Sequence, residues 1–174
     1  MDSAKTLPES HSDLPFLNGV LDRVERELKQ REQVGFLYFD VIEFGRLIET
    51  HGPEVGQRLL QALGDTLNMQ RGKLFRDEDL IAVGGPEVDF FVIYLFSPPR
   101  RKESFAKSDL KLIANRVLQK LSYMINETAA RLGVEEKIDL RGGYTVLKYD
   151  PNTPVDRLVY EARKEAALKT ELEE

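Results

Sequence analysis

The order of short apolar runs and longer amphipathic stretches restricts what this chain can fold into. Residues 35–39 and 90–96 are apolar runs of strand length, and their aromatic content predicts buried strands. Residues 73–75 and 80–83 are also predicted to be strand, and Gly84-Gly85-Pro86 separates the second of these runs from the run at 90–96. Two strands joined by a turn rich in Gly and Pro predict a β-hairpin. A further strand is expected over residues 138–149.

Apolar residues at helical spacing predict helices between these strands. The predicted helices cover residues 16–33, 43–50, 54–68, 108–132 and 155–173. The order of helix, strand, two helices, two strands, helix, strand and helix places two crossovers around a central hairpin. With right-handed crossovers, this order predicts an α+β fold, a ferredoxin-like mixed sheet of four to five strands with helices packed around it. We expect residues 1–15 to be a flexible lead and residues 16–174 to form the domain.

Length and composition exclude several classes of protein. The chain has 174 residues, enough for one domain with a buried core, and it has no cysteine, which excludes disulfides, thiolate metal sites and thiol nucleophiles. Its net charge of −5 argues against nucleic acid as a partner, although Arg100-Arg101-Lys102 forms a local basic cluster in an expected loop. The N-terminus lacks an apolar signal sequence, and the longest apolar run is too short to cross a bilayer. We therefore expect a cytoplasmic domain without membrane insertion in this segment.

Three short motifs, taken in order, resemble the GGDEF (diguanylate cyclase) domain family. They are residues 38–44, then His51-Gly52 followed by Gly56, and then Gly84-Gly85 at the hairpin tip. The resemblance implies a ferredoxin-like domain of bacterial cyclic di-GMP signalling. In that family two GTP molecules, held between two protomers, are joined into cyclic di-GMP, and two divalent metal ions neutralise the developing charge. An active member would therefore use Mg²⁺, bind GTP and work as a homodimer.

The chain departs from the family pattern at positions that carry its chemistry. Asp40 falls on the first metal-binding aspartate, but Ile42 stands in place of the second acid and Gly45 in place of a lysine near the phosphates. Ile48 and Gln57 replace the asparagine and the aspartate that read the guanine. An apolar side chain cannot hydrogen-bond a base, and each lost partner of a buried purine edge costs about 1–3 kcal/mol. The substitutions predict a degenerate domain that has no cyclase activity and needs no cofactor.

The hairpin loop can be aligned with the family signature in two ways. Without a gap, Pro86 takes the metal-ligand position and Glu87 is the catalytic candidate. With two extra residues in the turn, Asp89 takes the metal position beside Asp40. The pair Gly84-Gly85 would approach the nucleotide in either alignment, and one of the two signature acids is missing in both. Hairpin geometry, solvated turn residues and a helix N-cap at Asp40 explain the same residues without a ligand.

Arg76 and Asp79 resemble the Arg-x-x-Asp pattern of the inhibitory site, which binds the product and precedes the signature in this family. An arginine can stack on guanine and donate two hydrogen bonds to it, and a carboxylate can accept from its N1 and N2 hydrogens. The resemblance therefore implies a cyclic di-GMP site at this pair. The pair lies one residue closer to the glycines than in the family, and the same pattern also arises by chance.

Three functions are compatible with these motifs. The first is a degenerate GGDEF domain, a regulatory or interaction module that binds cyclic di-GMP or a guanine nucleotide and controls an attached or partner output domain. The second is an active diguanylate cyclase with Asp40 and Asp89 as Mg²⁺ ligands. The third is a structural or dimerisation domain without a ligand. We expect the first, because the losses at Ile42, Gly45 and Ile48 occur together in one site.

Overall fold

The helices and strands follow the predicted order in the computed structural model, which describes residues 14–84, 90–98 and 104–168. The helices are η1 (Leu17–Val20), α2 (Leu21–Arg31), α3 (Phe44–His51), α4 (Pro53–Met69), α5 (Lys107–Arg131) and α6 (Val155–Leu168), and the strands are β1 (Gln33–Val41), β2 (Leu80–Gly84), β3 (Phe90–Leu95) and β4 (Leu140–Lys148). The helix expected over 16–33 is thus a 3₁₀ turn followed by α2. Most of the expected lead, residues 1–13, lies outside the described part, so its flexibility stays a prediction.

The four strands form one sheet in the order β2-β3-β1-β4. The three neighbouring strand pairs are all antiparallel. The α+β class and the ferredoxin-like order are confirmed, but the expectation of a mixed sheet is wrong. The crossovers do join parallel strands, as expected, but those strands are not neighbours. β3 lies between β1 and β2, and β1 lies between β3 and β4.

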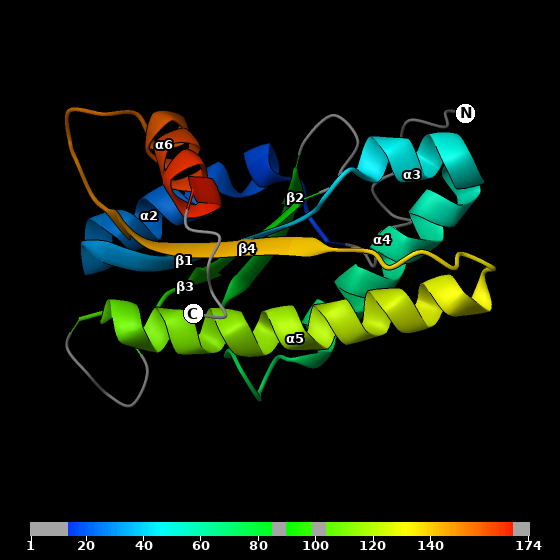
Figure 1. Ribbon diagram of the computed structural model, residues 1–174. Coiled ribbons are helices and arrows are strands. Elements are labelled where there is room, and N and C mark those ends of the chain that lie inside the picture. The colour runs from blue at the N-terminus through cyan, green and yellow to red at the C-terminus, as the bar shows by residue number, and fades with distance from the viewer. Residues whose placement is uncertain (1–13, 85–89, 99–103, 169–174) are drawn as a thin grey trace.

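The sheet is the middle layer of three (Figure 1). Helices α4 and α5 cover one face, where apolar residues such as Leu63 and Leu121 pack against Leu37 and Phe39 of β1. Helices α2 and α6 cover the other face, where Phe36 is part of a second core. Among the described helices, none has the length and apolar character that a membrane span requires.

Two connections near α4 show how local chemistry sets the boundaries of elements. Gly52 has a φ of 98°, which glycine adopts without strain, and Pro53 begins α4 at a position where its missing N–H is not needed. Residues 73–75, which we expected to form a strand, instead turn back on α4. Their backbone N–H groups all donate to the carbonyl oxygen of Gln70, so they are used up locally and cannot pair with a neighbouring strand.

Candidate functional site

Asp40 lies near the end of β1 and is only 8% exposed. Its partner across the β1–β4 pairing is Arg141. The guanidinium of Arg141 donates to both carboxylate oxygens, from Nη2 to Oδ2 at 2.8 Å and from Nε to Oδ1 at 3.2 Å. The hydroxyl of Tyr38 donates to Oδ2 at 2.7 Å. Both oxygens of Asp40 are therefore held by side chains of the sheet itself.

The groups around Asp40 stabilise its negative charge. Burial raises the pKa of Tyr38, and the hydrogen bond to Asp40 raises it further, so this hydroxyl stays a donor. The hydrogen bond to Asp40 also raises the pKa of Arg141. A second guanidinium, that of Arg163 on α6, lies 4.9 Å from the centroid of the Phe90 ring, which packs beside Tyr38. The carboxylate thus has a cationic partner, Arg141, that belongs to the protein itself, and a second cation lies near Tyr38.

The described residues around Asp40 do not fit a magnesium site. A Mg²⁺ ion needs oxygen ligands in near-octahedral geometry, several of them from water and at least one from a free carboxylate. In the part of the chain that the structure describes, no three acidic, histidine or cysteine side chains are grouped so that they could hold a metal ion. Ile42, at the place of the expected second acid, is apolar and 40% exposed. Glu87, Asp89 and Gly85 lie outside the described residues.

Asp40 is also not the N-cap of the helix that follows it. Helix α3 begins at Phe44, and the residue at its N-cap position is Glu43, whose φ is 57°. The alternative role considered for Asp40 is thus wrong. Its ion pair with Arg141 instead joins β1 to β4 at the end of the sheet.

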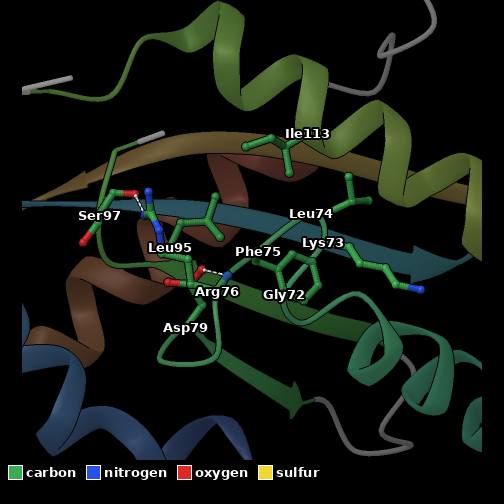
Figure 2. Close-up of a pocket in the computed structure, with 9 residues that line it drawn as sticks. All are labelled: Gly72, Lys73, Leu74, Phe75, Arg76, Asp79, Leu95, Ser97 and Ile113. Carbon is green, nitrogen blue, oxygen red and sulfur yellow. Dashed lines mark hydrogen bonds between the residues drawn. The ribbon is translucent and has the colours of Figure 1, made fainter. Parts of the chain in front are cut away.

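Arg76 and Asp79 lie in the turn before β2, beside a cavity of about 260 Å³ (Figure 2). Asp79 is only 3% exposed. Its Oδ2 accepts from the backbone N–H of Arg76 at 2.8 Å and its Oδ1 from that of Phe96 at 3.0 Å. Burial raises the pKa of this carboxyl, and the two backbone hydrogen bonds oppose that rise. The guanidinium of Arg76 donates to the carbonyl oxygens of Ser97 and Pro98 instead. The pair is adjacent, but its polar groups already bind the backbone.

Solved structures share this arrangement of strands and helices. The GGDEF domain of YfiN (TpbB) from Pseudomonas aeruginosa matches with a TM-score of 0.65 and 20% identity, over 91% of both chains. The diguanylate cyclase SiaD from the same organism, solved with its activator SiaC, matches with a TM-score of 0.62 and 20% identity over 91% of this chain. The GGDEF domain of DgcB from Caulobacter crescentus, in complex with cyclic di-GMP, matches with a TM-score of 0.56 and 15% identity, over 87% of this chain and 82% of its own.

The chain has the GGDEF-domain fold. It spans 55% of the length of the SiaD chain, so SiaD has much that lies outside this fold. No protein-family model and no curated protein matches the sequence significantly. The likeness therefore rests on structure, at identities that establish the fold.

Two glycines of the GGDEF motifs have a packing reason in this chain. A Cβ atom on Gly84, the last residue of β2, would lie 2.5 Å from the ring of Phe90, its cross-strand partner. A Cβ atom on Gly56 would lie 2.8 Å from Ile48. Ile48 therefore packs against α4 at the place where the GGDEF resemblance puts a guanine contact. Space for a base at this place would require Ile48 to move.

Sequence reasoning missed Arg141 and Glu136 as partners. Both follow from tertiary pairing, namely the β1–β4 register for Arg141 and, for Glu136, a hydrogen bond of 2.8 Å to His51 at the end of α3. One signal was present for Arg141, because a charged residue in the expected strand at 138–149 needs either solvent or a partner. For Glu136 the sequence holds no comparable signal.

Proposed function

We propose that this domain is a degenerate GGDEF fold that works as a regulatory or interaction module in cyclic di-GMP signalling and does not make cyclic di-GMP. The observation that carries the proposal is the ion pair of Asp40 and Arg141, with Tyr38 as a third member. The guanidinium of Arg141 is bound to the carboxylate that, by the GGDEF resemblance, would bind a metal ion.

Electrostatics supports this proposal. A magnesium ion that bound Asp40 would have to displace a guanidinium held by two hydrogen bonds, and it would then lie beside that same positive charge. Ile42 offers no side-chain oxygen to replace what is lost. Two magnesium ions are needed in the family's reaction to neutralise the developing charge, so the described residues argue against that reaction here.

The nucleotide contacts support the same proposal. Ile48 packs over Gly56 and cannot accept or donate a hydrogen bond, so a guanine at this place would leave polar atoms unpaired. Cyclic di-GMP at Arg76 and Asp79 would require Asp79 to give up its hydrogen bonds to two backbone N–H groups. We therefore place the function in protein contacts rather than in nucleotide chemistry. That SiaD was solved with a protein activator is consistent with a role of this kind for the fold.

The deciding experiment is a cyclase assay on the full chain. The protein is incubated with GTP and Mg²⁺, and then with GTP and Mn²⁺, and the nucleotides are separated by chromatography beside an active cyclase. We expect no cyclic di-GMP. Product that forms with the intact chain and is lost in Asp40→Asn would contradict the proposal and support the active-cyclase alternative.

Calorimetry with cyclic di-GMP and with GTP tests the nucleotide part separately. We expect no heat of binding at Arg76 and Asp79. If the domain binds cyclic di-GMP and Arg76→Ala abolishes that binding, the domain would instead be a regulatory module that binds cyclic di-GMP. That result would leave the cyclase conclusion untouched, because the two sites share no residue.

A further inference from the structure

Helices α4 and α5 form a groove on the outside of the molecule, on the face of the sheet opposite to α2 and α6. Two hollows, of about 400 and 520 Å³, adjoin along it and share Thr66, Met69 and Met124. The start of α4 lies by the end of α5, and the end of α4 by the middle of α5, so the two walls run antiparallel. The residues that line it, the groove residues, are Arg58, Gln61, Ala62, Asp65, Thr66, Met69, Gln70, Lys73, Gln119, Lys120, Tyr123, Met124, Thr128, Arg131 and Leu132.

Large apolar side chains of α4 and α5 are exposed to solvent along the groove. Met69 is 62% exposed and Tyr123 is 64% exposed, and they lie on opposite walls. Met124 and Leu132 add further apolar lining. Methionine is flexible and polarizable, which suits a surface that must fit a partner's side chains. Tyrosine supplies a large, rigid contact with a polar tip, and it is enriched at protein interfaces.

Positive charge lies at both ends of the groove. Lys73 and Lys120 line one end, and Arg58 and Arg131 line the other. Within the described residues, neither lysine has an ion-pair partner, and the ion pairs of the two arginines are exposed contacts of 3.7 Å to glutamates of their own helices. Such contacts are worth little in water. Arg131 also donates to the hydroxyl of Thr128 at 3.5 Å. In Figure 2, Lys73 extends away from Arg76 and Asp79. Asp65 is the one acidic side chain among the groove residues, against four basic ones. On a chain of net charge −5, the groove therefore carries a local excess of positive charge that attracts an acidic partner.

One buried polar atom in the groove wall has no partner within the described chain. Gln70 is 5% exposed, and its Nε2 donates to the carbonyl oxygen of Thr66 at 3.2 Å, but its Oε1 accepts from no group there. An unpaired buried acceptor costs about 1–3 kcal/mol. Because this atom is buried, a donor from a bound chain would reach it only after the Gln70 side chain turned toward the groove.

The length of the groove favours an extended partner over a compact ligand. The α5 wall runs from Gln119 to Leu132, which at the rise of an α-helix is about 20 Å, or nearly four turns. An amphipathic helix of that length places an apolar stripe along such a groove and charged residues at its edges.

We propose that the α4–α5 groove docks an acidic amphipathic helix of a partner protein. The apolar stripe of that helix would contact Met69, Tyr123 and Met124, and its acidic residues would pair with Lys73 and Lys120. The inference deepens the proposed interaction role by naming a surface and a partner chemistry. It can still be judged apart from that role, because the cyclase assay involves none of the groove residues.

The methionines allow a direct test. The chain has three, and two of them line the groove, so a protein labelled with ¹³C in the methionine methyl groups reports on the groove through Met69 and Met124, with Met1 as the reference. The probes are two synthetic amphipathic peptides of about 18 residues with the same leucine stripe, one with a glutamate-rich and one with a lysine-rich polar face. We expect the acidic peptide to shift both groove signals and the basic peptide to leave them unchanged at the same concentration.

Charge-reversal variants locate the contact. In Lys73→Glu combined with Lys120→Glu, we expect the acidic peptide to bind at least about tenfold more weakly, with an affinity that no longer falls as salt is added. Lys29→Glu combined with Lys148→Glu makes the same change in net charge on other elements, and it should keep the affinity within about twofold. Tyr123→Ala removes apolar contact without changing charge, and it should weaken binding too.

The proposal would be overturned by any of three results. The acidic peptide could leave Met69 and Met124 unshifted, the two peptides could bind equally well, or the control pair of substitutions could weaken binding as much as the groove pair. Sedimentation of the chain alone gives a further check. A stable homodimer that Tyr123→Ala dissociates would show that a second copy occupies the groove, and it would replace the proposed partner.

Discussion

Asp40 shows how one partner determines what a carboxylate at a motif position binds. A buried carboxylate is costly unless it is paired and hydrogen-bonded. Here Arg141 and Tyr38 supply three hydrogen bonds, and Arg141 itself still reaches solvent, with 41% of its side chain exposed. The arrangement stabilises the ionised carboxylate without any ion from solution. The hydrogen bonds of Asp40 therefore stabilise the pairing of β1 with β4.

Removing the guanidinium should therefore destabilise the fold. In Arg141→Gln, we expect the free energy of unfolding to fall by about 1–3 kcal/mol, because Asp40 stays buried while it loses its counter-charge. Urea denaturation at neutral pH measures the loss. The control is Arg46→Gln, whose ion pair with Glu43 is 76% and 63% exposed, and it should cost under about 0.5 kcal/mol. Equal effects of the two substitutions would mean that Asp40 does not depend on Arg141.

Asp79 gives a second prediction at this scale. In Asp79→Asn, an amide NH₂ must face one of two backbone N–H groups, so we expect a loss of about 2 kcal/mol in the free energy of unfolding. Asp77→Asn, in the same turn but with an exposed side chain, is the matched control and should change stability by less than about 0.5 kcal/mol. Denaturation curves of the two variants decide it, and an unchanged midpoint in Asp79→Asn would leave the carboxylate free for a ligand.

The resemblance to the GGDEF motifs could single out Asp40, Arg76 and Asp79 as candidates, because it places each of them at a motif position. It could not say what each side chain binds. The partner of Asp40 lies 101 positions away in the chain, and the second N–H bound by Asp79 belongs to Phe96, across the hairpin. Such partners depend on strand register, which a single sequence does not fix.

Helix α6 packs so closely on β4 that only a glycine fits at position 143. A Cβ atom on Gly143 would lie 1.8 Å from the backbone carbonyl oxygen of Ala166. In Gly143→Ala, the helix and the strand must separate, and we expect a loss of about 1–3 kcal/mol or more in the free energy of unfolding. Gly45→Ala is the control, because nothing lies within 4 Å of its Cβ position in α3, and it should stabilise by about 0.5–1 kcal/mol. Thermal denaturation of both variants measures the contrast, and similar shifts of one sign would contradict it.

The contact of His51 with Glu136 joins the end of α3 to the segment before β4, and it makes stability depend on pH. The hydrogen bond from His51 lowers the pKa of Glu136 below 4.5. A lowered carboxyl pKa adds stability above the ordinary value and loses it as the pH falls through the lowered value. Glu136→Gln should therefore lower Tm at pH values above about 4.5 and lose this difference in more acidic solution. Glu135→Gln, at the exposed neighbour, should show no such pH dependence in the same melting experiments.

Apolar runs of strand length and apolar residues at helical spacing were sufficient to predict the main elements, because these elements must bury apolar side chains. The two strands of the hairpin were predicted from their apolar runs, and the helix expected over 108–132 is α5 (Lys107–Arg131). Periodicity failed at residues 73–75, where the hydrogen bonds to Gln70 outweigh the apolar character of the segment. The pattern also could not distinguish a mixed sheet from an antiparallel one. That difference depends on which strands are adjacent in the sheet, and the path of each crossover connection determines this.

At the scale of the whole molecule, one sheet serves two cores. Side chains alternate along β1, so that Leu37 and Phe39 belong to the core under α4 and α5, and Phe36 and Tyr38 to the core under α2 and α6. Because both cores are built on the same strands, disruption of one core would also expose the apolar side chains of the other to solvent. The groove on α4 and α5 and the ion pair at Asp40 thus lie on opposite sides of one cooperative unit.

A cooperative unit should respond in the same way to a defect on either face. Leu28→Ala in α2 and Leu63→Ala in α4 each remove a fully buried side chain, and we expect each to cost about 2–5 kcal/mol. Hydrogen exchange followed by mass spectrometry should show faster exchange in the amides of both helical layers for both variants, because the slowest amides exchange through global unfolding. Leu112→Ala, at a side chain that is 42% exposed, should leave those amides nearly unchanged. If Leu28→Ala loosened α2 and α6 and left α4 and α5 protected, the two layers would be independent, and a partner bound in the groove could not sense the state of the other face.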